Sequence, residues 1–267
     1  MLGLGSSLST GGSIDTFAPS NIDNLVLWLK VNTNITSDEA DGGGAISHSS
    51  NAGDMDDEDK VNAWNAFGGT SINAVQTTSA DKPLWETDAA DFGGVSSPGN
   101  NKHFDLSSDI VFDANTDFTI AVRVRPTDFS SRCLMGSADT EFIRINSNTV
   151  IRMKVNSTNR DFTLGSSNLA DDKYITILIV RSDESTGNIN IYIRGEDSGY
   201  FDGTAAGTAF GSELQDAGEI TVSNLMADKD GSDEFNGYMK DVIIYDGTAV
   251  DSTQREQLFD YLESQNY

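Results

Sequence analysis

The residues best suited to chemistry lie in the acidic turn Asp228-Lys-Asp-Gly-Ser-Asp-Glu234, near the end of the printed chain. The turn places the carboxylates of Asp228, Asp230 and Asp233 around a glycine, and calcium prefers such closely spaced oxygen ligands. The segment lacks the bidentate glutamate that completes a twelve-residue calcium loop. The alternative is a solvated turn, which is favoured because Asp-Gly turns are common for backbone reasons alone. Calcium is therefore a hypothesis here, and no other cofactor is indicated.

Groups suited to catalysis are sparse. Glycoside hydrolysis needs two carboxylates on one strand face, and no expected strand carries that pattern. The run Asp57-Glu-Asp59 has the composition but lies in a charged loop, without the apolar flanks that raise the pKa of a carboxyl group. His48 and His103 lie in polar loops and should be solvated, and the single cysteine, Cys133, should be a small buried residue. We therefore expect a protein that is not an enzyme, with no catalytic residues.

A sugar-binding site needs exposed aromatic rings beside hydrogen-bonding side chains. Tyr192 is the best-placed ring, because it accompanies Asn190 and Arg194 on the outward phase of an expected strand. The alternative role of Tyr192 is packing against a neighbouring strand. Trp28 lies in an apolar strand and should belong to the core. The sequence thus offers Tyr192, Asn190 and Arg194 as a candidate glycan site.

Basic residues gather in the middle of a strongly acidic chain. The formal net charge is −25, yet residues 118–194 hold ten Lys/Arg against eight Asp/Glu. Such a charge excludes nucleic acid and anionic membrane as partners of the whole surface. The arginines expected at outward phases or strand ends are Arg123, Arg125, Arg181 and Arg194, and a second set, Arg144, Arg152 and Lys154, extends them if the strands are neighbours.

This arginine pattern has two interpretations. A basic stripe on one sheet face could dock an acidic partner surface, including the acidic part of another copy. The alternative is an ordinary solvated strand face with local ion pairing. The docking hypothesis assigns Arg123, Arg125, Arg181 and Arg194 to the contact with a partner.

The elements that must position these groups are mostly strands. Alternating apolar residues predict a strand over Phe118–Arg125 and a hairpin of Tyr174–Arg181 with Asn188–Arg194. One helix is expected near the end, capped by Asp251 or Ser252, with an apolar stripe of Leu258, Phe259 and Leu262. About a dozen short strands and one helix predict an all-β fold, an antiparallel β-sandwich of the jelly-roll kind. We expect a Gly/Ser-rich arm over residues 1–17 and a single domain over 18–267.

The order of these elements resembles that of laminin G-like, concanavalin A-like lectin/glucanase jelly rolls. The segments that carry the resemblance are Ile22–Leu29, Val61–Trp64, Asn73–Gln76, Lys82-Pro83, Asp117–Val124, Tyr174–Ile177, the closing strand Phe235–Tyr245 and the helix after it. The family consists mostly of binding and structural modules, and its domains often bind calcium near the sandwich rim. The resemblance therefore implies a binding or building role and permits a calcium ion.

The first eleven residues, Met-Leu-Gly-Leu-Gly-Ser-Ser-Leu-Ser-Thr-Gly, are similar to those of structural proteins of marine, cyanobacteria-infecting tailed phages. This resemblance implies a virion location, as a capsid decoration or a tail- or fibre-associated module, with other virion proteins or copies of itself as partners. It agrees with the lack of a signal-peptide pattern in this sequence, because phage proteins are made in the host cytoplasm and leave by lysis. The alternative is a carbohydrate-binding or adhesin module for host-surface glycans. Either way we expect no membrane insertion and an oligomeric assembly.

Overall fold

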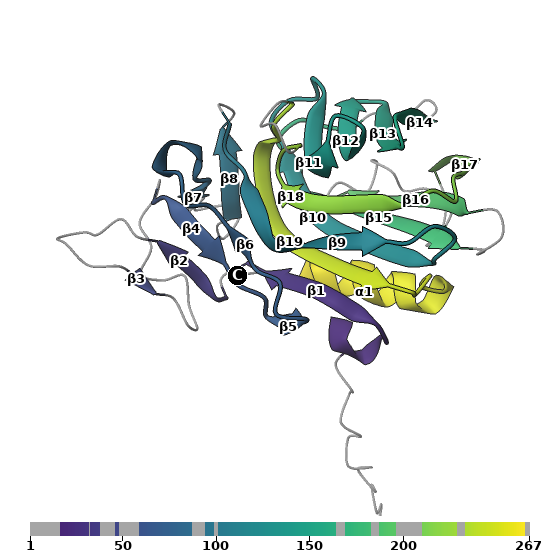
Figure 1. Ribbon diagram of the computed structural model, residues 1–267, viewed down its shortest axis with the longest axis horizontal. Helices are drawn as coiled ribbons and strands as arrows, with labels where there is room; N and C mark the ends of the chain where they lie inside the picture. The colour runs from purple at the N-terminus through teal and green to yellow at the C-terminus, as the bar shows by residue number, and fades with distance from the viewer. Residues whose placement is uncertain are drawn as a thin grey trace, which may run out of the picture.

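The chain folds as a sandwich of two antiparallel β-sheets, with one α-helix packed on the outside of one sheet (Figure 1). This arrangement confirms the predicted all-β sandwich with a C-terminal helix. The computed structural model describes residues 17–31, 33–37, 46–47, 59–86, 94–98, 101–163, 169–182, 187–195, 210–228 and 233–264. The expected N-terminal arm lies outside these residues apart from Phe17, as does most of the acidic loop that precedes Asp59.

Sheet A contains nine strands, in the order β17-β16-β15-β10-β19-β1-β5, with β8 paired to β19 and β7 paired to β8. The bounds of these strands are β1 (Leu25–Lys30), β5 (Gly68–Gly69), β7 (Leu84–Glu86), β8 (Gly94–Pro98), β10 (Phe118–Pro126), β15 (Ile175–Ser182), β16 (Asn188–Gly195), β17 (Phe210–Gln215) and β19 (Asn236–Asp246). The predicted hairpin of Tyr174–Arg181 with Asn188–Arg194 is present as β15 and β16.

Sheet B contains ten strands, in the order β14-β13-β12-β11-β18-β9-β6-β4-β2-β3. Their bounds are β2 (Ile35–Ser37), β3 (Ile46–Ser47), β4 (Val61–Trp64), β6 (Ala74–Val75), β9 (Phe104–Phe112), β11 (Arg132–Ala138), β12 (Glu141–Ser147), β13 (Val150–Val155), β14 (Thr158–Thr163) and β18 (Ile220–Leu225). Two short 3-10 turns complete the described secondary structure, η1 (Pro19–Asn21) and η3 (Ser79–Asp81).

The main core lies between the two sheets and is built by period-2 alternation. In β10 the side chains of Phe118, Ile120, Val122 and Val124 point inward and are fully buried, as the sequence predicted. Across the sandwich, β12 and β13 contribute inward residues in the same way, with Arg144 and Arg152 on the opposite phase. Each large apolar side chain buried in this manner contributes about 1.5–3 kcal/mol, so the alternation fixes which side chains of a strand belong to the main core.

A second, smaller core lies on the outer face of sheet A. Helix α1 (Ser252–Ser264) buries Leu258, Phe259 and Leu262 there, against residues such as Trp28 and Ile243. Strand β1 is therefore buried on both faces, because Leu27 and Leu29 join the main core while Trp28 joins the second one. This confirms the interpretation of its uninterrupted apolar run.

Helix α1 begins with the predicted cap. The Asp251 carboxylate accepts a 2.9 Å hydrogen bond from the backbone N–H of Gln254, and the Gln254 side chain accepts one of 2.9 Å from the Asp251 N–H. This reciprocal pair satisfies two donors at the helix start. The turn from β19 into α1 uses Gly247 at φ +81°, a conformation that glycine adopts without strain. The cap and the turn together fold the helix back over sheet A.

Candidate interaction surfaces

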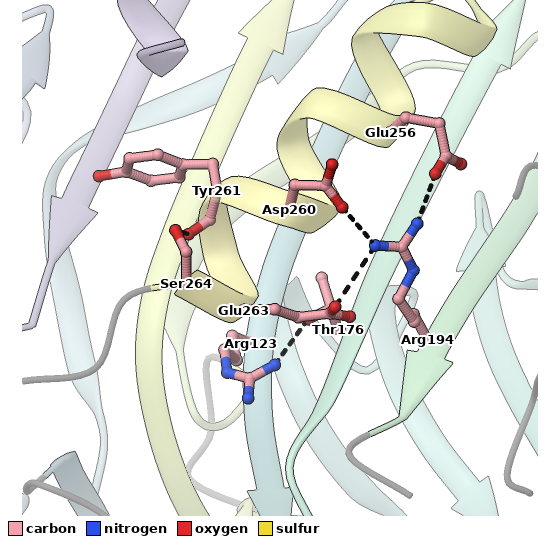
Figure 2. Close-up of polar contacts among 8 residues, drawn as sticks. All are labelled: Arg123, Thr176, Arg194, Glu256, Asp260, Tyr261, Glu263 and Ser264. Carbon is pink, nitrogen blue, oxygen red and sulfur yellow. Dashed lines mark hydrogen bonds and ion pairs between the residues drawn. The ribbon is translucent and has the colours of Figure 1, made fainter. Parts of the chain in front are cut away.

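Arg194 of β16 connects helix α1 to sheet A through several ion pairs (Figure 2). Its guanidinium donates to Glu256 at 2.5 Å, to Asp260 at 2.9 Å and to Glu263 at 3.3 Å, all on one side of the helix. The same guanidinium lies 4.5 Å from the ring centroid of Phe259. The acidic surface that Arg194 docks is therefore part of its own chain.

Arg194 stands at one end of a polar row that crosses five strands of sheet A. Strand register places these residues opposite one another in the order Lys30, Asp241, Arg123, Thr176 and Arg194. Arg123 donates a 3.1 Å hydrogen bond to the Thr176 hydroxyl (Figure 2) and is only 8% exposed. Burial raises the pKa of Glu263, the last acidic residue of α1, while Arg194 opposes that rise. The row meets α1 near the C-terminal end of the helix, where Arg194 contacts Asp260 and Glu263.

Arg181 lies at a strand end, as expected, but it is buried, which corrects its expected exposure to a partner. It is 1% exposed, and its guanidinium donates to the backbone carbonyls of Thr116 at 2.7 Å, Gly218 at 2.6 Å and Asp113 at 2.7 Å. Burial lowers the pKa of this guanidinium. The group ties two loops to the end of β15 because backbone carbonyls that turn inward need donors. Arg123 is also buried, which corrects its expected exposure in the same way.

Arg125, another predicted docking arginine, remains partly exposed. Its guanidinium lies 4.4 Å from the ring centroid of Tyr238 and 5.7 Å from that of Tyr174. The neighbouring residue Lys240 is the extra residue of a bulge in β19, and its Nζ lies 4.1 Å from the Tyr174 centroid. Gly237 makes room for this crowded backbone, because a Cβ at its φ of +147° would lie 2.2 Å from the Arg125 carbonyl. A docking role for Arg125 stays a prediction.

The candidate glycan residues lie on the face that α1 covers. Tyr192 packs in the second core, and the Arg255 guanidinium of α1 lies 4.2 Å from its ring centroid. Arg194 is engaged by the three acidic residues described above, and Asn190 pairs across the sheet with Val180. One ring face of Tyr192 is thus already stacked, which favours the packing role over a sugar contact. The sequence shows the outward phase of Tyr192 but not the helix that returns to cover it.

The two described candidate calcium residues, Asp228 and Asp233, differ in their surroundings. Asp233 is exposed and forms an ion pair with Arg144 of β12, and Asp228 is buried below the surface. Asp230 lies outside the described residues. Over the described ranges, no group of three or more His, Cys, Asp or Glu side chains is arranged to hold a metal ion. Calcium at this turn stays a prediction.

The second set of basic residues lies on the outer face of sheet B, so the two sets do not form one stripe. Arg152 of β13 donates to Asp161 of β14 at 2.5 and 2.7 Å, and this pairing lowers the Asp161 pKa. Arg144 and Lys154 flank the ring of Phe142, with their cationic atoms 4.5 and 5.4 Å from its centroid. We call Arg144, Arg152 and Lys154, with Phe142, the sheet B cation face. Its members are held in place by stacking and ion pairs on a surface that α1 does not cover.

The most exposed aromatic ring among the described residues is one that sequence reasoning missed. Phe67 is 47% exposed and packs edge-on against Trp28, with ring centroids 4.6 Å apart. Trp28 in turn meets Tyr261 of α1 at 5.7 Å, and Tyr261 meets Phe17 at 6.3 Å. Phe67 stands between β4 and β5, in an Asn/Gly-rich segment without strand alternation. In the sequence, the exposure of Phe67 was therefore indicated only by the position of one aromatic residue within a turn-rich segment.

Cys133 and His103 occupy enclosed positions. The Cys133 thiol is buried as predicted, and burial raises its pKa. The His103 ring is mostly buried and lies within 2.6 Å of the Asn101 carbonyl, which corrects its expected solvated position. Neither residue is arranged with a described partner as a nucleophile and base would be.

Comparison with known proteins supports the fold assignment. The binding domain of botulinum neurotoxin serotype G is 15% identical, with a TM-score of 0.52, and the match covers 90% of this chain and 52% of that one. The binding domain of Paraclostridial Mosquitocidal Protein 1 is also 15% identical, with a TM-score of 0.53 and coverages of 91% and 53%. The chain thus spans about half the length of either structure, and such identities show the fold alone.

No curated protein sequence matches the chain. In the part of the chain that the structure describes, no helix is long and apolar enough to cross a bilayer. A family model described as the concanavalin A-like lectin/glucanases superfamily matches residues 98–253, more than half of the chain. These residues run from the end of β8 into α1, and the protein belongs to that superfamily.

Proposed function

We propose that this protein is a non-enzymatic structural and interaction protein of a tailed-phage particle, in which the sandwich docks on partner subunits. The superfamily is of the concanavalin-like, carbohydrate-binding type, and the two similar structures are binding domains. The phage context rests on the resemblance of the first eleven residues. The observation that carries the docking role is the sheet B cation face.

This face suits docking for two reasons. Its cations are already immobilised, since Arg152 is held by Asp161 and Lys154 rests on Phe142, and ordered side chains lose less entropy on binding. Its three cations also outnumber the two carboxylates paired with them, Asp161 and Asp233, which favours an acidic partner and speeds its encounter. Because α1 covers the part of the outer face of sheet A around Trp28 and Ile243, the outer face of sheet B offers a sheet surface that the helix leaves open.

The proposal is tested on purified phage particles by quantitative mass spectrometry, with the charge-reversed variant Arg152→Glu and the matched control Lys173→Glu. Lys173 is an exposed cation outside this face. Both variants replace one cation by a glutamate, so they change the net charge equally. We expect wild type and control in a fixed copy number and the Arg152 variant depleted at least about tenfold, which corresponds to about 1.4 kcal/mol. Absence of the wild-type protein from the particles would contradict the virion role.

A second candidate function, recognition of host-surface glycans, is favoured by the exposed ring of Phe67. Sugars bind on exposed aromatic rings near polar groups, and Lys30 Nζ lies 5.4 Å from the Phe67 centroid. Binding to a glycan array, lost in Phe67→Ala and kept in Val111→Ala, would support this function. Val111 is the matched control because, within the described ranges, it is the other well-exposed large apolar side chain.

A further inference from the structure

We infer that the outer face of sheet B is self-complementary, so that a second copy of this chain docks on it face to face. The inference rests on the proposed docking function of this face and names its partner. It is carried by the strand register, which places opposite charges at equal distances from the middle of the face.

One row of residues crosses five strands of this face, with β11 at its centre. Register places Lys154 of β13 opposite Phe142 of β12, and Phe142 opposite Gly136 of β11. On the other side, Gly136 faces Asn224 of β18, which faces Asp105 of β9. A cation thus stands two strands from Gly136 on one side, and a carboxylate stands two strands from it on the other.

A two-fold axis in the plane of the interface, running along β11, exchanges the two ends of this row. The Lys154 ammonium of each copy then meets the Asp105 carboxylate of the other, and the same symmetry repeats the contact. Phe142 and Asn224 lie between these charges and are buried within their own chain. Gly136 at the centre adds no side chain, and any Cβ there would lie 2.9 Å from the Glu141 carbonyl. The middle of the face is therefore low enough for close approach.

The acidic end of the row is open to a partner. The Asp105 side chain is 57% exposed, and the Asn224 amide holds its carboxylate in the row with a 2.5 Å hydrogen bond. Further along β9, Asp109 is exposed, and Val111 presents an apolar side chain that is 40% exposed. Charge complementarity between the β9 end and the sheet B cation face thus favours a second copy as the occupant.

The size of the face predicts a weak dimer. Five strands at about 4.8 Å spacing span about 19 Å, and six residues of strand span about 20 Å. The resulting footprint of about 400 Å² per copy is about half that of a standard interface. We therefore expect dissociation near 100 μM, to order of magnitude, and weakening by salt because the end charges are partly exposed.

The test is sedimentation equilibrium of the full chain at protein concentrations up to about 500 μM, at low salt and at about 1 M salt. Wild type should dimerise at low salt, and the variants Lys154→Glu and Asp105→Lys should each be monomeric, because each makes both ends of the row alike in charge. An equimolar mixture of the two variants should dimerise again, since the reversed charges then meet. Lys173→Glu, with the same charge change as Lys154→Glu, should behave as wild type. Thermal melts identify any variant that fails to fold, in which case Asp109→Lys replaces Asp105→Lys.

A wild-type chain that stays monomeric throughout, or a mixture that stays monomeric while both variants are folded, would overturn the inference. These results remain separable from those of the particle experiment. A monomer whose particle association is lost in Arg152→Glu would leave the docking function standing with another partner. A dimer whose disruption leaves particle association unchanged would instead sink the docking function and retain the self-complementary face.

Discussion

The Arg194 guanidinium of β16 donates a 2.5 Å hydrogen bond to the Glu256 carboxylate of α1, and this contact joins the helix to the outer face of sheet A. Two more helix acids, Asp260 and Glu263, accept from the same guanidinium. A surface that the sequence offers to an external partner is thereby occupied by the chain itself.

Removing this guanidinium should loosen α1. We expect Arg194→Gln to lower the free energy of unfolding by about 1–2 kcal/mol, because three partly exposed ion pairs and a stacked ring are lost together. Urea unfolding measures the change. The control is Arg160→Gln, which removes a single ion pair with Asp216 and should cost less than about 0.5 kcal/mol. Equal losses in the two variants would show that the three acids contribute no more than one.

Tyr192 and Arg194 show what sequence periodicity can and cannot predict about a strand. Alternation in Asn188–Arg194 correctly assigned both residues to the outer phase of their strand, because side chains of a strand point to opposite faces in turn. It could not show that α1 folds back over that phase, since the return path depends on the turn at Gly247 and on apolar contacts between distant segments. The helix, its cap and its stripe were each predictable, but its docking site was not.

Arg181 should be the arginine whose loss costs most stability. Arg181→Met keeps much of the side-chain volume but leaves three inward backbone carbonyls, those of Thr116, Gly218 and Asp113, without this donor. We expect a loss of about 3–5 kcal/mol in the free energy of unfolding, measured by chemical denaturation. Arg181→Lys should recover only part of it, because an ammonium group cannot reproduce the planar fork. A loss below about 1 kcal/mol for Arg181→Met would mean that water satisfies the carbonyls.

The burial of Arg181 could not be predicted from the sequence, because it too depends on contacts between distant segments. It stands at the end of a strand whose apolar residues were predicted correctly, and a terminal arginine there normally reaches solvent. Its three acceptors come from two loops, around Thr116 and Gly218, that carry no recognisable pattern. Only the packed structure shows that these loops turn their carbonyls toward one point.

Cys133 should be unreactive in the folded protein. It is 1% exposed, and burial raises the pKa of its thiol, so little of the reactive thiolate forms near neutral pH. We expect alkylation by iodoacetamide at about pH 8 to be at least about 100-fold slower in the native protein than in guanidinium chloride. Mass spectrometry reports this directly, because the chain has one cysteine. Rapid modification of the native chain would place Cys133 in a segment that opens readily.

Calcium binding at the Asp228–Asp233 turn is tested by a thermal melt with and without a chelator. Because Asp233 is already paired with Arg144, we expect the melting temperature to change by less than about 2 °C. The variant Asp233→Asn should respond to calcium no differently from wild type. A calcium-dependent rise of about 5 °C or more, abolished by Asp233→Asn, would instead establish the ion.

Asp128 should give the protein a pH-dependent stability at the acidic end. Hydrogen bonds from Arg132 lower its pKa from 3.8 to about 2, assisted by the Ser130 N–H at 3.0 Å and the Asn236 amide at 2.8 Å. A folded-state pKa below the unfolded one means that the charged carboxylate stabilises the fold. This stabilisation is complete above pH 3.8 and disappears as the pH falls through about 2.

Asp128→Asn should therefore destabilise the protein by about 1 kcal/mol at pH 7, a value kept small because the side chain is 34% exposed and solvent screens the pair. The difference from wild type should shrink as urea unfolding is repeated at falling pH below 3.8. Asp109→Asn is the matched control, because Asp109 is exposed on β9 and its replacement removes the same charge. A difference that persists unchanged at the lowest pH would assign the Asp128 contribution to neutral hydrogen bonds and not to its charge.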